Sequence, residues 1–345
     1  MSRDSCHHRL LMILSKSLRV VLILAICVMV LPGCSMIYDF PPRSSNSECP
    51  LQIKNYLGNT QNIHPKVLYF QNGWQGYRFW MAYTPYPNGK TSAENPCIAV
   101  SDDGLRWSVP HGLTNPLAKA RREGYNSDTH LVYDESADRL ECWWREYDIK
   151  NNRDQICRRT SYDGVKWSPR EVMLPYNNTY KGRLSPAVWI ESEYYKMVYS
   201  SGSRLMLIQA PYGEEELHWS SPVEIPIDWK GLSAWHHDLI VGSDGIWELV
   251  VCAFMPGGNN NTADLYYVEL SPDFSYVSEP ELILGRGVGP NDFDSRSIYR
   301  SSIVRVDDEV YLYYSSIDEK WNRFMSLLRG PSVFELHGLS FDDFL

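Results

Sequence analysis

Five short apolar segments recur along the chain, and each opens on polar residues. Each is followed by a second segment dense in aromatic residues, and the first four then reach a turn closed by an aromatic ring, at Trp107, Trp167, Trp219 or Tyr276. Short apolar runs bounded by turns are typical of β-strands, and a repeat of roughly fifty to sixty residues of strands and turns is typical of a propeller blade. The sequence therefore predicts an all-β protein, a single five-bladed β-propeller. The aligned segments are HPKVLYF (64–70), DTHLVYD (128–134), SPAVWIE (185–191), HHDLIVG (236–242) and RSSIVRV (300–306).

One repeat array covers most of the chain, so we expect one propeller domain at 62–345 rather than two domains. The last blade needs chain from near one terminus to close it, and the apolar tail at 331–345 is available for this purpose. Aromatic residues make up 13% of the sequence. Packing between twisted sheets accounts for most of them, and the remainder are candidates for surfaces that stack on sugars.

The N-terminus carries a targeting segment. Lys16 and Arg19 precede an apolar run at 20–30 that is short for a membrane span and ends in Leu-Pro-Gly-Cys, with the cysteine at position 34. This ending resembles a bacterial lipoprotein signal, which implies a signal peptide at 1–33 and a lipid anchor on Cys34. An ordinary secretory signal cleaved nearby is the alternative and would also export the chain. Residues 34–61 are then a lipid-anchored tether and lead-in, and the protein is expected on the cell envelope, at the outer membrane in a Gram-negative organism.

Charge and cysteine content exclude some partners. The whole chain carries a net charge of −9, and the signal segment carries +3, so about −12 remains after its removal. Such a balance argues against nucleic acid as a ligand. Cys142 and Cys157 flank a turn between consecutive strands and could form a cross-strand disulfide in an oxidising compartment. No Cys-x-x-Cys or paired Cys/His spacing occurs, so no metal site is expected. We expect a monomer.

In a propeller the first strand of each blade lines the central channel, so alternate positions of the aligned segments should point into one space. Nine of the ten side chains at the first and third positions are polar. Polar channel residues can simply hydrogen-bond water, yet carboxylates, imidazoles and cations that converge on one cavity also perturb each other's pKa values and define a candidate site. These positions hold His64 and Lys66, Asp128 and His130, Ser185 and Ala187, His236 and Asp238, and Arg300 and Ser302.

The five-fold spacing, the blade turns SDDGLRW (101–107) and SYDGVKW (161–167) and the opening SPAVW (185–189) resemble the five-bladed propeller glycosidases, the clan of arabinanases, β-xylosidases, invertases and levansucrases. The resemblance implies an Asp base, a supporting Asp and a Glu acid at the openings of blades one, two and three. Here those places hold His64, Asp128 and Ser185, so only the middle one matches. It implies no cofactor, although a calcium ion in the channel is compatible with the family.

Other carboxylates can complete a catalytic pair. Glu94 precedes Asn95 and Pro96 and echoes the E-x-P triplets of that clan, and Asp238 points inward from blade four. Glycoside cleavage needs one carboxyl group to protonate the leaving oxygen and another to activate water. We therefore predict an inverting mechanism with Asp128 as base and Asp238 or Glu94 as acid. The expected substrate-binding residues are His64, Lys66, His130, Ser185, His236 and Arg300.

The predicted function is that of an exported, membrane-anchored glycoside hydrolase acting on an extracytoplasmic oligosaccharide or polysaccharide. The alternative is a non-catalytic carbohydrate-binding or envelope scaffold propeller, which the missing acids of blades one and three favour. Convergence of Asp128, Asp238 and Glu94 in space would favour the first interpretation.

Overall fold

A computed structural model describes residues 44–345 apart from 177–181, 215, 256, 259 and 290. The predicted signal peptide, Cys34 and the first part of the tether lie outside the described residues. Within the described part of the chain, no helix has the length and apolar character needed to cross a membrane.

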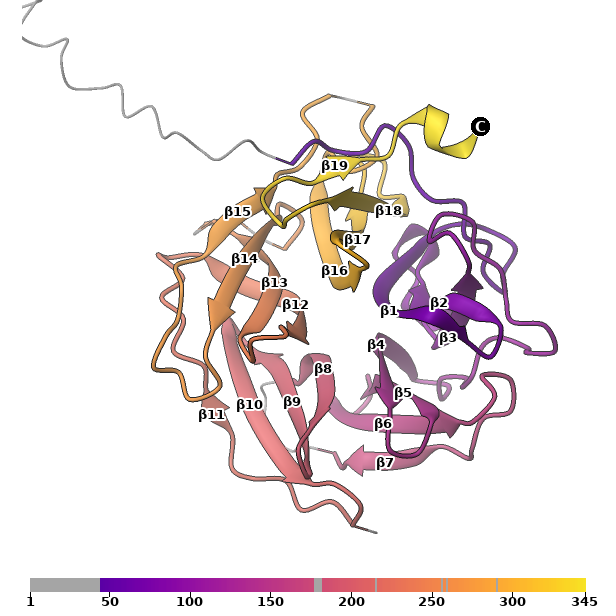
Figure 1. The fold of residues 1–345 in the computed structure, drawn as a ribbon, viewed down its shortest axis with the longest axis vertical. Helices are drawn as coiled ribbons and strands as arrows, with labels where there is room; N and C mark the ends of the chain where they lie inside the picture. Colours follow the sequence, from indigo (N-terminus) through magenta and orange to yellow (C-terminus); the bar gives the residue numbers. More distant parts are fainter. Residues whose placement is uncertain (1–43, 177–181, 215, 256, 259, 290) are drawn as a thin grey trace, which may run out of the picture. The chain divides into compact units, whose positions relative to one another are not determined.

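The described residues form five antiparallel sheets placed around a common centre (Figure 1), which confirms the prediction of an all-β, five-bladed propeller. Three short 3-10 helices complete the described elements, η1 (Pro87–Gly89), η2 (Thr91–Ala93) and η3 (Phe341–Phe344). From the centre outward the strands are β1 (Asn62–Trp74), β2 (Tyr77–Pro85) and β3 (Cys97–Ser101); β4 (Gly124–Asp134), β5 (Arg139–Asp148), β6 (Arg153–Ser161) and β7 (Glu171–Leu174); β8 (Leu184–Glu191), β9 (Tyr194–Ser201), β10 (Arg204–Pro211) and β11 (Val223–Glu224); β12 (Ser233–Val241), β13 (Trp247–Phe254), β14 (Asp264–Leu270) and β15 (Glu281–Leu284); β16 (Ser297–Val306), β17 (Glu309–Ile317), β18 (Arg323–Gly330) and β19 (His337–Gly338).

The innermost strands are the five that the hydrophobic pattern singled out. Around the ring, β1 contacts β4 and β16, β8 contacts β4 and β12, and β12 contacts β16. The hydrophobic cores lie between neighbouring blades, and each cluster combines side chains from two of them. Trp80, Trp143, Trp144 and Trp247 are fully buried there, so these tryptophans serve packing rather than sugar binding.

Every innermost strand carries a β-bulge near its start, where two of its residues face one residue of the second strand. In the first three blades the first bulge residue is His64, Asp128 or Ser185, and each has a positive φ, of 58°, 55° and 52°. A bulge re-aims side chains, and a left-handed backbone at a residue other than glycine costs about 1–3 kcal/mol. Strain of this size, repeated at one level of three blades, marks that level as a candidate functional site.

The bulges also correct the alignment of the last two blades. By register, the residues equivalent to His64 are Trp235 in β12 and Tyr299 in β16, not His236 and Arg300. The hydrophobic pattern missed this one-residue shift because a bulge inserts a residue without changing the alternation on either side. His236 and Arg300 remain inside the bulges as their second residues.

Both ends of the described chain complete the fifth blade. The tail supplies β19, as predicted, and Ser45 forms a parallel bridge with His337 of that strand. Further along, the backbone N–H of Leu51 donates to the carbonyl of Met325 in β18 at 2.8 Å, and Leu51 and Ile53 are buried. Residues 44–55 of the expected tether and lead-in therefore pack against the last blade.

The predicted disulfide is wrong, because Cys142 and Cys157 are both free and buried. They lie on adjacent strands, but the register places Cys157 opposite Trp144 and Cys142 opposite Arg159. A disulfide requires Cβ atoms about 3.5–4.5 Å apart, whereas diagonal positions of a sheet are farther from each other. The turn length suggested the pairing, and the register excludes it.

Candidate functional site

Four of the predicted residues meet at the bulges of blades one to four. His236 Nδ1 lies 3.1 Å from Asp128 Oδ1, and His64 Nε2 lies 3.5 Å from the same oxygen. The Ser185 hydroxyl is 2.5 Å from His236 Nδ1 and 3.2 Å from Asp128 Oδ1. The Ser127 hydroxyl donates to the second carboxylate oxygen at 2.8 Å. Asp128 is thus the centre of the cluster, and all of its members are at most 2% exposed.

The electrostatics of the cluster separate an ionised carboxylate from neutral imidazoles. Burial raises the pKa of Asp128, but His64, His236 and Arg145 outweigh it and hold the pKa well below its usual range. Burial lowers the pKa of His64 strongly and that of His236 less, with Asp128 opposing the shift in both. At neutral pH the cluster therefore presents one anionic oxygen ligand and two neutral nitrogen ligands.

The same three residues fit a divalent cation. Their ligand atoms lie within 4.8 Å of one another, and the separations of 3.1 and 3.5 Å bracket the roughly 3.4 Å between ligands that hold one ion tetrahedrally. The Nε2 atoms of His64 and His236 are buried without a hydrogen-bond partner. His64 Nδ1 accepts from the Asp128 amide at 3.1 Å, so His64 ligates through Nε2 only after that contact is released. His236 Nδ1, the nitrogen nearest to Asp128, likewise contacts the Ser185 hydroxyl at 2.5 Å, so each histidine gives up one contact when it ligates from this side.

Glu94 lies directly after η2, and its charge interacts with that of Asp128. It is 4% exposed, and burial followed by the negative charge of Asp128 raises its pKa well above the usual range, against the opposing effect of Arg145 and Arg323. A carboxyl group with a raised pKa accepts a proton more readily than an ordinary glutamate does. The pKa values of Glu94 and Asp128 are therefore shifted in opposite directions although the two carboxyl groups interact.

Asp238, Lys66, His130 and Arg300 form a second cluster within the channel. Lys66 Nζ donates to both carboxylate oxygens of Asp238 at 2.9 Å, and the backbone N–H of Ile303 donates to one of them at 3.3 Å. Arg300 Nη2 lies 3.2 Å from His130 Nδ1. All four residues are at most 4% exposed. Both oxygens of the Asp238 carboxylate are engaged by Lys66. The geometry therefore gives Asp238 a structural role, the ion pair that joins blades one and four.

An aromatic wall covers the two histidines, and the sequence analysis missed it. Tyr299 lies 4.5 Å from the His236 ring and 5.4 Å from the His64 ring, and Trp235 stands at 4.6 Å in an edge contact with Tyr299. Both rings are partly exposed. Burial, followed by the charges of Glu94, Tyr86 and Asp128, raises the pKa of Tyr299 well above its usual range, so its hydroxyl stays protonated. The hydrophobic pattern carries no signal for them, because they lie at the first bulge positions of β12 and β16.

A cavity of about 170 Å³ lies between β5, β6 and the start of β8. Arg145 lines it and also lies 3.8 Å from Asp128 Oδ2, while its Nε donates to Asp154 at 3.0 Å. Arg183 pairs with the same Asp154 carboxylate. Arg145 therefore connects the buried carboxylate to a space that can hold part of a ligand, and it is a further residue that the sequence analysis missed.

We expect acid to destabilise the fold through His237. Its ring lies 3.2 Å from the Val198 carbonyl and 3.1 Å from the Ser200 hydroxyl, and burial lowers its pKa to about 3. Since the unfolded value is about 6.5, the unfolded state binds the extra proton between these values, and stability falls as pH drops below about 6.5. His237→Gln should reduce the slope of the unfolding free energy between pH 6 and pH 4 by about 1.4 kcal/mol per pH unit. Urea titrations at several pH values measure it, and equal slopes would contradict the assignment.

Comparisons with known proteins agree on the architecture. No protein-family profile matches the chain. An N-acetyl-α-D-galactosamine deacetylase acting on A type blood, from Flavonifractor plautii, is 24% identical over 83% of this chain, and the chain spans 43% of that protein. The crystal structure of an N-acetylgalactosamine deacetylase from F. plautii with blood group B trisaccharide superposes with a TM-score of 0.68 at 20% identity, covering 82% of this chain and 93% of that one.

Glycoside hydrolases share the fold as well. The catalytic domain of the family 62 α-L-arabinofuranosidase of Coprinopsis cinerea superposes with a TM-score of 0.59 at 12% identity, covering 83% of this chain and 96% of that domain. A thermostable family 43 glycoside hydrolase superposes with a TM-score of 0.58 at 11% identity, covering 86% and 96%. The chain has the five-bladed propeller fold of these carbohydrate-active enzymes. These enzymes include glycosidases, the class that the sequence resembles, and a deacetylase.

Proposed function

We propose that this protein is a hydrolase that removes the N-acetyl group from an amino sugar of an extracytoplasmic glycan. The observation that carries the proposal is the Asp128 cluster, in which an ionised carboxylate and two neutral histidines converge and two imidazole nitrogens lack partners. Two histidines and one carboxylate are a ligand set of catalytic zinc sites in hydrolases. The similarity to an N-acetylgalactosamine deacetylase supports the same reaction class.

His64, Asp128 and His236 would hold the cation. When bound, a divalent cation supplies Lewis acidity toward the acyl oxygen and lowers the pKa of water. Ser185 and Ser127 hold the Asp128 carboxylate in place through hydrogen bonds at 3.2 and 2.8 Å.

Glu94 and Tyr299 carry the proton chemistry. Glu94 takes the proton of the attacking water and passes it to the nitrogen as the C–N bond breaks, which its raised pKa suits. The protonated Tyr299 hydroxyl donates to the oxygen of the acetyl group as negative charge develops there. Acetate and a free amino sugar are the products, and one water is consumed.

The aromatic wall positions the sugar. Trp235 and Tyr299 present ring surface on one side of the histidines, and the C–H face of a pyranose stacks on such a surface. Arg145 and the cavity of about 170 Å³ beside it accept polar substituents of the neighbouring sugar.

The test is a comparison of products. The purified protein is incubated with N-acetylgalactosamine and N-acetylglucosamine glycosides, and with arabinan and xylan oligosaccharides. Release of acetate without new reducing ends is the expected result. New reducing ends without acetate would overturn the proposal and establish glycoside hydrolysis, and binding without either product would establish a non-catalytic carbohydrate-binding propeller.

Glycoside hydrolysis remains a second candidate because one observation favours it. Asp128 has a lowered pKa and Glu94 a raised pKa in the same site, which is the division of roles of a base and an acid in an inverting glycosidase. In that case Glu94 is a better acid than Asp238, whose carboxylate is engaged by Lys66. NMR of the first product would then detect inversion.

We further propose that the protein is exported and anchored by lipid on Cys34, on the basis of the LPGC sequence after a short apolar run. Cys34→Ala should move the protein from the membrane pellet to the soluble fraction while the propeller melts at the same temperature. Fractionation measures where the protein is found, and mass spectrometry of the N-terminal peptide detects the lipid. A wild-type protein that is already soluble and carries no lipid mass would contradict the anchor.

A further inference from the structure

A groove between blades two and three, distinct from the Asp128 site, is built to bind a ligand. It has a volume of about 840 Å³ and is lined by residues of β5, β6, β7 and β9 and by the described residues of the turn after β10. Asp134, whose carboxylate lies beneath it, is six residues from Asp128 on β4, which is about 20 Å along a strand. A sugar bound in the groove would therefore not occupy the candidate active site.

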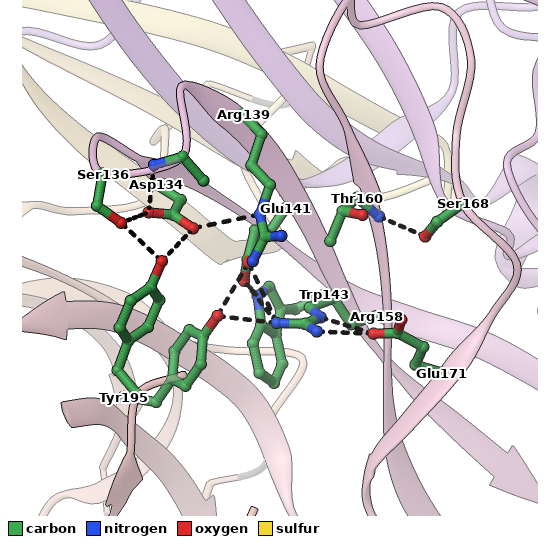
Figure 2. A network of polar contacts seen from close by, with 12 residues as sticks. Asp134, Ser136, Arg139, Glu141, Trp143, Arg158, Thr160, Ser168, Glu171 and Tyr195 are labelled. Carbon is green, nitrogen blue, oxygen red and sulfur yellow. Dashed lines mark hydrogen bonds and ion pairs between the residues drawn. The ribbon is translucent and has the colours of Figure 1, made fainter. Parts of the chain in front are cut away.

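The groove has a fixed polar floor. Figure 2 shows Arg139 and Arg158 converging on the fully buried Glu141, with hydrogen bonds of 2.8 and 3.1 Å. Tyr195 from blade three donates to the same carboxylate at 2.9 Å, and Arg158 also pairs with Glu171 at 2.7 Å. Because these side chains hold each other, a ligand would meet an organised surface with little loss of side-chain entropy.

The walls combine apolar contact with negative charge. Val172 is 44% exposed, and partly exposed Met173, Leu217 and Tyr212 line the groove with it. Among the described residues, the charged groups of the lining and floor are two arginines against five carboxylates, a formal net charge of −3. The carboxylates are Asp134, Glu141, Glu171, Glu214 and Glu216.

We infer that this groove binds an oligosaccharide carrying free amino groups, as a second carbohydrate site separate from the catalytic one. Apolar C–H faces of sugar rings fit the Val172, Leu217 and Tyr212 surface, and ammonium groups complement the excess of carboxylates. The negative charge of the groove is by itself the reason to expect a ligand with free amino groups. That such a ligand is also the product of the deacetylation rests on the proposed function. Binding in the groove would then hold the protein on glycan that it has already deacetylated.

The experiment measures calorimetric binding of a glucosamine tetrasaccharide and its fully N-acetylated counterpart to the full mature chain carrying Asp128→Asn. The cationic probe should bind more tightly, and added salt should weaken it. The double variant Glu214→Gln/Glu216→Gln should weaken that binding about tenfold, and Val172→Lys should do the same by placing a cation in the groove. All three residues are exposed, so the fold should persist.

The matched control is Asp308→Asn/Glu309→Gln, which removes the same charge from the exposed turn before β17 and the exposed first residue of that strand. It should leave binding unchanged. Equal binding of both probes, or equal losses in groove and control variants, would overturn the inference. In the chain with Asp128 restored, the groove variants should keep wild-type acetate release from a monosaccharide glycoside. Absence of acetate release from every form would refute the proposed function while leaving the binding result readable.

Discussion

Asp128→Asn is expected to lower kcat/KM for acetate release by about a thousandfold or more, or about 4 kcal/mol of transition-state stabilisation. The substitution nearly preserves shape but removes the only anionic partner that His64 and His236 contact within 4 Å among the described residues. Steady-state kinetics on a monosaccharide glycoside measures the loss. Sugar binding, followed by tryptophan fluorescence, should persist because the aromatic wall is untouched.

Asp238→Asn is the matched comparison, since it also removes a fully buried carboxylate from the channel. It leaves Lys66 buried without its partner, so we expect a loss of stability of about 3–5 kcal/mol rather than a specific loss of turnover in the folded fraction. Glu94→Gln should resemble Asp128→Asn in activity and the wild type in stability. Full activity in Asp128→Asn, or chemistry abolished only by Asp238→Asn, would refute the assignment of the site.

Removal of divalent cations is expected to abolish activity, with a loss of about a hundredfold or more that zinc, manganese or cobalt restores. The expectation follows from two neutral imidazoles and one carboxylate, which ligate these ions readily, at ligand separations of 3.1 and 3.5 Å. Dialysis against a chelator, followed by assays with each ion and elemental analysis of the native protein, measures it. A bound cation should also raise the melting temperature, because it stabilises only the folded state.

The control is His236→Gln, which should lose both the activity and the rise in melting temperature. His64→Gln should also weaken cation binding, since it removes the other nitrogen ligand. Undiminished activity in chelated protein that contains no metal by elemental analysis would refute the cation and favour the two-carboxylate glycosidase.

The sequence alone predicted the five blades, their innermost strands and the closing tail, because each depends on a hydrophobic alternation that survives local irregularity. It also predicted that His64, Asp128, Ser185 and His236 lie together in the central channel. It could not place Trp235 and Tyr299, because the bulges that turn them toward the histidines leave no trace in that alternation. Nor could the sequence distinguish the role of Asp128 from that of Asp238. The ion pair that engages Asp238 joins it to Lys66, 172 positions away in the chain, and no local pattern shows such a contact.

The closure of blade five makes the order of synthesis matter. Gly338 donates to the Ser45 carbonyl across a separation of 293 residues, and β19 cannot pair until nearly all of the chain has been made. Closing so long a loop is slow compared with forming a hairpin within one blade. Blades one to four can therefore form early, but the ring stays open at one seam until the C-terminus arrives. A chain truncated before residue 337 should consequently be a protease substrate even though every residue of the Asp128 cluster is present.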